Sequence, residues 1–247
     1  MEDASARRGL TGNLLKWIAI VCMLIDHLAW TFIPFDSPLG MAMHLIGRVT
    51  GPTMCFFIAE GYFRTRNVRK YALRLLVFAV LSWPCFSLFE SGKLFTPELG
   101  MIWTLFWSLL ALCACDRLQN PVLKILSVFA CCAFSILGDW PIFGVLYVLA
   151  LGLNHPLRGG SFRKQVLWFS VVTVLMAMLE PVAALIAFPG QLTDALLVAL
   201  LNLGVLLALP LLWRYNGQRG GKPWMKWAFY IFYPLHLLVL AVIDLVL

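Results

Sequence analysis

The sequence predicts an all-α integral membrane protein, a polytopic bundle of about nine transmembrane helices with its N-terminus in the cytoplasm. Three observations support this: an excess of apolar residues, their grouping into stretches that can cross a bilayer, and basic residues between alternate stretches. Hydrophobic residues make up 62% of the 247 residues, charged residues make up 13%, and the mean hydropathy is +0.87. A soluble domain is about half apolar and about a quarter charged. These values exclude a soluble, disordered, disulfide-rich secreted or nucleic-acid-binding protein.

The apolar stretches give the predicted helices in order. A helix needs about 20 residues to cross about 30 Å of hydrocarbon. The stretches run over residues 14–34, 41–62, 71–89, 97–115, 122–137, 140–153, 165–188, 192–213 and 224–247. The fifth and sixth are short, and only the segment Gly138-Asp139-Trp140-Pro141 separates them. We expect a cytoplasmic segment over residues 1–13 and a single transmembrane domain over residues 14–247.

The basic residues give the orientation and account for the net charge of +7. All Lys and Arg residues except Lys93 and Arg48 lie before the first stretch or around the loops after the second, fourth, sixth and eighth. Basic loops stay in the cytoplasm, so nine crossings place the C-terminus outside. If the fifth and sixth stretches formed one helix, the chain would cross eight times, and the last two basic clusters would lie outside the cell, against this rule. The first stretch has no small-residue cleavage site, so we expect it to be retained.

The first stretch carries an Asp26-His27 pair, and ionisable groups inside a bilayer are costly and mark functional sites. Lys16 precedes His27 by 11 residues, which on a helix is about 16 Å in depth and about 20° in azimuth. We therefore expect Lys16 and His27 to line one cavity. The alternative is that His27 forms a structural hydrogen bond between helices. Asp26 is turned by about 100° from His27, so we expect it to pair with another helix.

The second stretch carries Arg48 about 10 Å inside its outer edge, close to the depth of His27. An arginine cannot lose its proton, so Arg48 needs an anion at that depth. Asp26 is the first predicted partner and Asp139 the second. Gly47 and Gly51 form a step of small residues beside Arg48 that allows another backbone to come close. A purely structural ion pair is the alternative.

Two basic segments are predicted to bind phosphate groups, because arginine side chains match phosphate oxygens in bidentate pairs. The first segment covers residues 64–74, and we expect Glu60, which precedes it, to pair with its basic residues. The second covers residues 214–222 and contains glycines that expose backbone N–H groups for anions. Anionic lipid headgroups are the alternative ligand. Together with the first stretch, the predicted phosphate-binding residues are Lys16, Arg64, Arg66, Arg69, Lys70, Arg74, Arg214, Asn216 and Arg219.

The ninth stretch places Tyr230, Tyr233 and His236 three residues apart, so that neighbours in this series lie on adjacent turns. His236 lies about 16 Å from the cytoplasmic edge, which matches the depth of His27. A belt of aromatic residues at the interface explains a tyrosine but not a histidine at mid-depth. A structural role for His236 is the alternative. We expect no metal site.

Several short sequence motifs, spread over nearly the whole chain, match the motifs of a known protein family. They include Ile25-Asp26-His27, Gly47-Arg48, Ala59-Glu60-Gly61-Tyr62, Arg64-Thr65-Arg66, Lys70-Tyr71-Ala72-Leu73-Arg74, Gly138-Asp139, Tyr215-Asn216-Gly217-Gln218-Arg219-Gly220 and Tyr233-Pro234-Leu235-His236. In these strings the chain resembles the TraX family of membrane proteins. The founding member of that family is associated with N-terminal acetylation of conjugative pilin.

The resemblance implies a multi-pass acetyltransferase of the bacterial inner membrane that uses acetyl-CoA as acyl donor, related in design to larger membrane acyltransferases with a mid-membrane histidine. The chain looks closer to the chromosomal branch of the family than to the pilin enzyme, whose basic loops differ. The acceptor is therefore open between an amine and a hydroxyl, on a pilin N-terminus or on an envelope glycan or lipid. Membrane lipids are expected partners, nucleic acid is not, and the oligomeric state is open.

The residues and the resemblance fit one mechanism, in which the basic segments hold the phosphates of acetyl-CoA and the thioester reaches mid-membrane. His27 would act as general base or would take the acetyl group covalently, and Arg48, Tyr233 or His236 would stabilise the oxyanion. The predicted catalytic residues are His27, Asp26, Arg48, Tyr233 and His236. A proton-coupled transporter is the rival function, but nine helices do not form two equal repeats. A non-catalytic scaffold leaves the mid-depth histidines unexplained.

Overall fold

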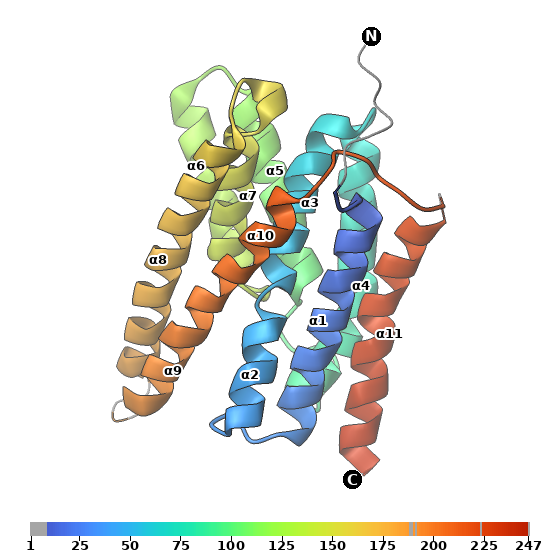
Figure 1. Ribbon diagram of the computed structural model, residues 1–247, viewed down its shortest axis with the longest axis vertical. Helices are drawn as coiled ribbons and strands as arrows, with labels where there is room; N and C mark the ends of the chain where they lie inside the picture. The colour runs from blue at the N-terminus through green and yellow to red at the C-terminus, as the bar shows by residue number, and fades with distance from the viewer. Residues whose placement is uncertain (1–8, 188–189, 191, 223, 247) are drawn as a thin grey trace.

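A computed structural model describes residues 9–187, 190, 192–222 and 224–246, and it is helical almost throughout (Figure 1). The described helices are α1 (Gly12–Phe32), α2 (Pro38–Gly47), α3 (Thr50–Arg64), α4 (Val68–Ser91), α5 (Met101–Arg117), α6 (Pro121–Ser135), α7 (Phe143–Leu153), α8 (Phe162–Ala187), α9 (Leu192–Leu203), α10 (Ala208–Trp213) and α11 (Met225–Val246), with short 3-10 helices at Pro156–Arg158 and Gly204–Leu207. Apart from a bridge between Leu10 and Tyr215, these described segments contain no β-structure. The predicted all-α class is confirmed.

Within the described residues, the eleven α-helices form nine successive runs, because α3 continues from α2 and α10 continues from α9. Five of these runs are long and apolar enough to cross a membrane: α1, α4, α8, the run from α9 to α10, and α11. The short fifth and sixth stretches form two separate helices, α6 and α7, as predicted. In Figure 1 the start of α1 lies at the upper end of the bundle and the end of α11 at the lower end. The side of the membrane that each end faces stays a prediction.

The second stretch, predicted as one helix, is broken at Arg48 and Val49 between α2 and α3. Pro52 explains the break, because it lacks the N–H group that would bond to the carbonyl of Arg48 in a continuous helix. The N–H groups of Arg48 and Val49 instead bond to the carbonyls of His44 and Ile46 at 3.0 and 3.2 Å. Arg48 keeps helical backbone angles (φ −59°, ψ −16°), so its side chain extends from the end of α2.

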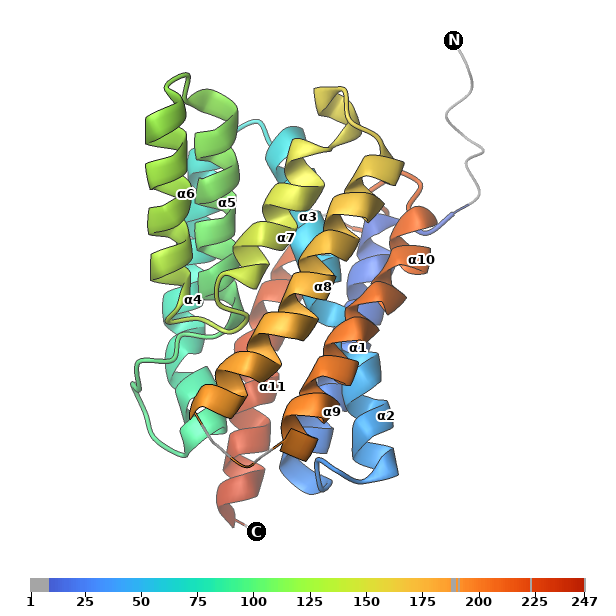
Figure 2. The same ribbon diagram turned by 90° about the vertical axis from the view of Figure 1, so that its left-hand side faces the viewer.

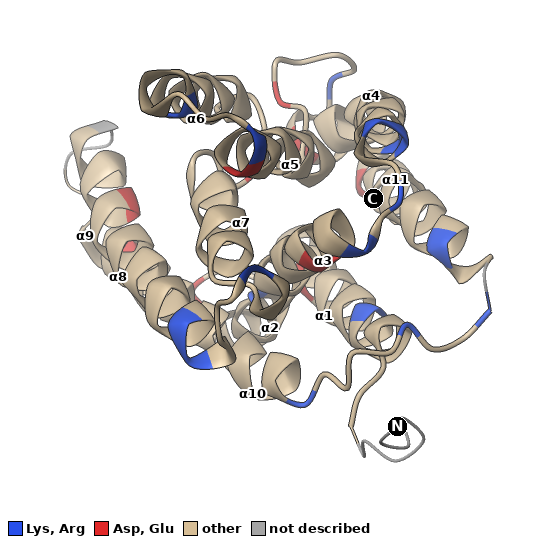
Figure 3. Ribbon diagram, turned by 90° about the horizontal axis from the view of Figure 1, so that it is seen from above, with Lys and Arg blue, Asp and Glu red and all other residues tan. Residues whose placement is uncertain are grey.

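The centre of the bundle is formed by α3 and α7, and α6 lies at its edge. Figure 3 shows α3 between α1, α5, α7 and α10, all of which it contacts. α7 has only 11 residues, nine of them buried, and a short helix is tolerated at membrane depth where other protein surrounds it. α6 packs mainly against α5 (Figure 2). Its exposed face carries apolar residues such as Ile125 and Phe129, as expected for contact with lipid.

The loop between α10 and α11 caps the start of α1. The N–H groups of Gly12 and Asn13 donate to the carbonyls of Gln218 and Arg219, both at 2.8 Å. The N–H of Asn216 donates to the carbonyl of Leu10 at 3.0 Å. The free N–H groups at a helix start need partners, and this loop supplies carbonyl oxygens to them. The backbone of Asn216 therefore holds the chain rather than facing outward as an anion-binding group.

The close contact between α1 and α2 depends on Gly47, and this gives a prediction. A Cβ atom at Gly47 would overlap the side chain of Asp26. Overpacking of this kind costs about 1–3 kcal/mol, so Gly47→Ala should lower the unfolding temperature of the protein in detergent micelles. Ala42→Ser, on the exposed side of the same helix, is the control. Equal unfolding temperatures for Gly47→Ala and the wild type would contradict this packing.

Candidate functional site

Two cavities lie one beyond the other along α1 and α4. The one nearer the start of α1, which we call the basic cavity, has a volume of about 440 Å³. The other, the acidic cavity, has a volume of about 400 Å³. Lys16 lines the basic cavity and His27 the acidic one, and no described residue lines both. The prediction that Lys16 and His27 share one cavity is therefore wrong.

Gly100 explains the separation of the two cavities. It precedes α5 with φ of +73°, and a Cβ atom there would lie 2.8 Å from both the ring of Phe86 and the hydroxyl of Tyr233. Phe86 lines the acidic cavity and Tyr233 lines the basic one. The N–H of Met101 donates to the Tyr233 hydroxyl at 3.0 Å, which fixes the tyrosine there. Phe86, Gly100 and Tyr233 thus lie at the boundary between the two cavities, and we call these three residues the wall.

The basic cavity combines cations with aromatic rings. Five basic residues from separate parts of the chain line it: Lys16, Arg64, Arg74, Arg219 and Lys226. The Lys16 ammonium lies 4.8 Å from the ring centre of Phe57 and 5.5 Å from that of Phe229. The Arg74 Nε donates to the Tyr230 hydroxyl at 3.2 Å. Ring faces attract cations without neutralising them, so the charges of Lys16 and Arg74 stay available for an anion.

The other predicted phosphate-binding residues do not line this cavity. Arg66, Arg69 and Lys70 are exposed around the start of α4, Arg214 is exposed after α10, and Asn216 lies in the loop that caps α1. Figure 3, which views the upper end, shows Lys and Arg residues spread over several helix starts and loops there. The structure thus brings four of the nine predicted residues together, namely Lys16, Arg64, Arg74 and Arg219, and adds Lys226.

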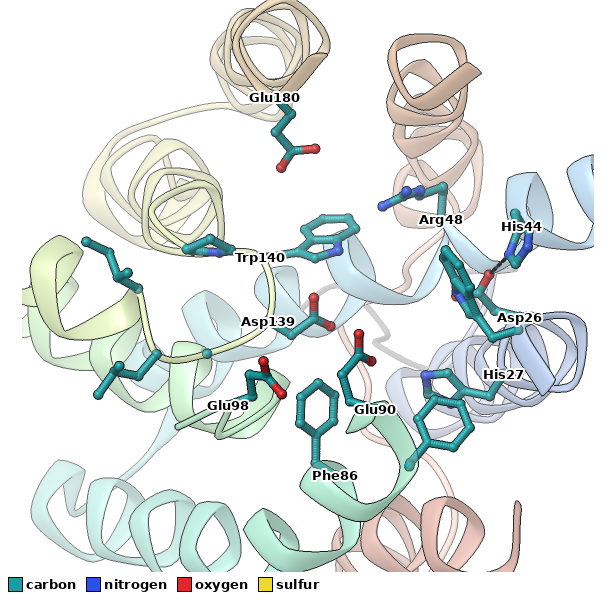
Figure 4. A pocket seen from close by; sticks show the side chains of 16 residues that line it. Asp26, His27, His44, Arg48, Phe86, Glu90, Glu98, Asp139, Trp140 and Glu180 are labelled. Atoms are coloured by element: carbon teal, nitrogen blue, oxygen red, sulfur yellow. Dashed lines mark hydrogen bonds and ion pairs between the residues drawn. The ribbon is translucent and has the colours of Figure 1, made fainter. Parts of the chain in front are cut away.

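His27 and His236 meet at the level of this wall. The distance between Nδ1 of His27 and Nε2 of His236 is 2.7 Å, and Nδ1 of His236 lies 2.8 Å from the carbonyl oxygen of Phe232. A carbonyl only accepts, so Nδ1 of His236 carries a proton. In a neutral pair Nε2 of His236 then accepts from Nδ1 of His27. This leaves Nε2 of His27 with a free lone pair, and the side chain of His27 lines the acidic cavity (Figure 4).

Asp26 pairs with α2, as predicted, but its partner is His44 and not Arg48. Oδ1 of Asp26 lies 2.8 Å from Nδ1 of His44, a side chain that is 2% exposed. The rings of Trp30 and Phe35 pack against that imidazole, with centres 4.6 and 5.3 Å away. Sequence analysis did not assign His44 to the site. The sequence does contain a signal for His44. The connection between α1 and α2 is short, and Asp26 and His44 are equally far from it along the chain, so their side chains can face each other.

Arg48 points into the acidic cavity and forms no ion pair with any residue that the structure describes. The predicted pairs with Asp26 and Asp139 are therefore absent, and Asp26 pairs with His44 instead. The guanidinium carbon of Arg48 instead lies 5.9 Å from the ring centre of Trp140. Gly51 makes room for this ring, since a Cβ there would lie 2.6 Å from it.

The loop between α6 and α7 holds Asp139 and Trp140 in the acidic cavity. Trp140 and Ile142 have φ angles of +56° and +63°, which are strained for bulky residues. Hydrogen bonds hold this shape: the Thr104 hydroxyl donates to the carbonyl of Asp139 at 2.5 Å, and the N–H of Ile142 donates to Ser135 Oγ at 2.9 Å. Strain of this kind often marks functional sites.

Five carboxylates line the acidic cavity: Asp26, Glu90, Glu98, Asp139 and Glu180 (Figure 4). Among the lining residues Arg48 is the single Lys or Arg. Sequence analysis did not single out Glu90, Glu98 or Glu180. Glu90 and Glu98 flank a predicted connection and gave no signal. Glu180 lies inside an apolar stretch, where an ionisable residue is itself a signal of function.

Glu60 lies outside both cavities and pairs with the basic segment that follows it, as predicted. It forms an ion pair with Arg64 and lies 2.7 Å from Nε2 of His155. Nearby, Asp116 accepts from the Tyr62 hydroxyl at 2.7 Å and pairs with Arg158 at 3.4 Å. These contacts join α3 to α5 and to the segment before α8. They have a structural role at the upper end.

Comparison with known proteins shows similarity over nearly the whole chain. The family model described as TraX protein matches residues 11–244. The chain is also 33% identical over 237 residues to the probable fimbrial assembly protein FimC, serogroup H1, of Dichelobacter nodosus. That match covers 92% of this chain and 93% of the relative. No solved structure matches the chain.

The proton positions in the histidine pair can be measured. The chain contains 4 histidines, so 15N-histidine NMR in micelles, assigned with single His→Gln variants, should resolve each ring. We expect His27 to carry its proton on Nδ1 and to keep Nε2 unprotonated in the neutral state. A neutral His27 with its proton on Nε2 would contradict the hydrogen-bond chain.

Proposed function

Since the chain belongs to the TraX family, we propose that it is an acetyltransferase of the bacterial inner membrane that transfers an acetyl group from acetyl-CoA to an amine or hydroxyl acceptor. The observation that carries this proposal is the free lone pair of His27 Nε2. His27 lies one helical turn beyond Met23, which lines the basic cavity. The relative in Dichelobacter nodosus is named as a fimbrial assembly protein, so a pilin or an envelope molecule is the proposed acceptor. The basic cavity would face the cytoplasm, where acetyl-CoA is made.

The basic cavity suits the acyl donor. Its five cations match the phosphates of coenzyme A, which Arg and Lys hold through charge-assisted hydrogen bonds. Beyond them the cavity is lined by apolar residues such as Met23, Met54 and Leu105, and Met101 and Tyr233 are also in its lining. The thioester arm would extend toward this wall. Met23 precedes His27 by four residues, which is about 6 Å along a helix.

His27 is the proposed general base. Its Nε2 would take the proton of the acceptor as the acceptor oxygen or nitrogen attacks the thioester carbonyl carbon. The carbon–sulfur bond then breaks, and the proton passes from His27 to the leaving thiolate. His236 does not touch the reacting atoms in this scheme. It fixes the ring and the tautomer of His27, and is a positioning residue.

Of the three residues predicted to stabilise the oxyanion, Tyr233 is the best placed. Its hydroxyl accepts from the N–H of Met101, so its own proton remains for an oxygen in the basic cavity. Arg48 lies in the other cavity, and His236 is held by His27 and Phe232. Asp26 holds His44 and is not in contact with His27 Nε2. A role for Asp26 is therefore to fix α2 against α1.

Binding of coenzyme A tests the donor site. Lys16→Met and Arg74→Gln should each weaken binding about tenfold, because each removes one charge-assisted contact. Equilibrium dialysis of labelled coenzyme A against the purified protein in detergent measures this. Arg163→Gln, an exposed position outside the cavity, is the control. Affinity that is equal in all four proteins would rule out the basic cavity as the donor site.

Loss of the base tests the chemistry. His27→Ala should lower acetyl transfer from labelled acetyl-CoA to membrane vesicles about 10²- to 10⁴-fold, the usual contribution of a general base. Its affinity for coenzyme A should stay within about twofold, since His27 lies outside the donor cavity. His155→Gln is the matched control. A wild-type rate in His27→Ala would remove His27 from the mechanism, and failure of the wild type both to bind coenzyme A and to transfer acetyl would favour a proton-coupled transporter.

A further inference from the structure

The acidic cavity has hydrogen-bond acceptors that are not used in ion pairs. Glu90, Glu98, Asp139 and Glu180 line it, and none of them forms an ion pair within the part of the chain that the structure describes. Glu98 accepts from the Thr96 hydroxyl at 3.2 Å and Glu180 from Asn202 at 2.7 Å. An ionised carboxylate only accepts hydrogen bonds. The cavity therefore suits a ligand with several donor groups.

Arg48 adds donors among these acceptors. Its guanidinium has no ion-pair partner in the described chain, and the face of Trp140 holds it at 5.9 Å. A ligand that fits this cavity must then both donate to carboxylates and accept from a guanidinium. A hydroxyl group does both, whereas an ammonium group only donates and is repelled by Arg48.

The walls of the cavity provide aromatic surface. Trp30, Phe86, Phe89 and Trp140 all line it. The C–H groups on one face of a sugar ring pack well on aromatic faces, whose negative charge attracts them. The volume of about 400 Å³ lies within the range of about 300–1,000 Å³ for small-molecule sites. The shape and the surface therefore fit one or two sugar units.

The charge of the lining selects among possible acceptors. Arg48 is the one Lys or Arg among five acidic side chains in the lining, so a phosphorylated lipid or an acidic sugar would find few cationic partners there. Carboxylates would also hold an amine in its protonated form, and a protonated amine has no lone pair for attack. A hydroxyl keeps its lone pairs while Nε2 of His27 takes its proton. The cavity thus favours a neutral hydroxyl acceptor.

We infer that the acidic cavity is the acceptor site and that it binds a neutral sugar, one hydroxyl of which becomes acetylated. This inference rests on the proposed transferase function. Carboxylates and Arg48 hold the hydroxyls that do not react, and the reacting hydroxyl lies against His27. Its oxygen bonds to the acetyl carbon, the carbon–sulfur bond breaks, and His27 passes the hydroxyl proton to the thiolate. The products are an acetate ester and free coenzyme A.

The test measures release of coenzyme A from acetyl-CoA by the purified protein with three kinds of added acceptor. These are neutral methyl glycosides of glucose, galactose, mannose and N-acetylglucosamine, a peptide with a free N-terminal alanine, and a glucuronide. We expect at least one neutral glycoside to raise release and to yield a product that mild alkali deacetylates. We expect no rise with the peptide or the glucuronide. A rise with the peptide alone, or with none of the neutral glycosides, overturns the inference.

Variants separate this inference from the proposed function. Asp139→Asn and Glu90→Gln should each raise the KM for the active glycoside about tenfold, because each weakens a hydrogen bond to a charged group. Affinity for coenzyme A should be unchanged. Asp36→Asn, an exposed acid outside the cavity, is the control. An unchanged KM in both variants overturns the acceptor site alone, whereas loss of coenzyme A binding in the wild type overturns the proposed function.

Discussion

The structure depends on the cost of keeping polar groups inside a bundle whose surroundings offer no water. Two pairs of polar side chains near the middle of the bundle illustrate this cost. Asp26 is satisfied by His44 and His27 by His236, at 2.8 and 2.7 Å. These two pairs fix α1 to α2 on one side and to α11 on another, so the hydrogen bonds that satisfy the histidines also orient the proposed base.

Cations follow a different arrangement in this protein. Lys16, Arg74 and Arg48 lie over aromatic rings at 4.8 to 5.9 Å from the ring centres. A ring face lowers the cost of burying a cation but leaves its charge uncompensated. A carboxylate in the same place would have neutralised it. The protein can therefore keep strong positive charge at membrane depth and still use it for a ligand, which both cavities require under the proposed function.

Much of the fold was predictable from sequence, because long apolar stretches occur mainly in membrane-spanning helices and a straight helix rises by a fixed amount per residue. The same geometry placed His27 and His236 at one depth, and the structure joins them. The surroundings of Arg48 were not predictable, because Asp26 pairs with His44 and Trp140 comes from a loop far along the chain. The acidic cavity was not predictable either. It gathers residues from α1, α2, α4, α8 and the connections between helices, and no periodicity links such positions.

The wall of Phe86, Gly100 and Tyr233 has a consequence for the cell that contains this protein. A continuous wet passage between the two cavities would let protons run down the membrane potential and would dissipate stored energy. Phe86 and Tyr233 pack on either side of Gly100 and narrow that passage, and under the proposed function the acetyl carbon would meet the acceptor hydroxyl in the gap beside His27. Under the proposed function, these three residues would limit the flow of protons while the acetyl group passes from one reactant to the other.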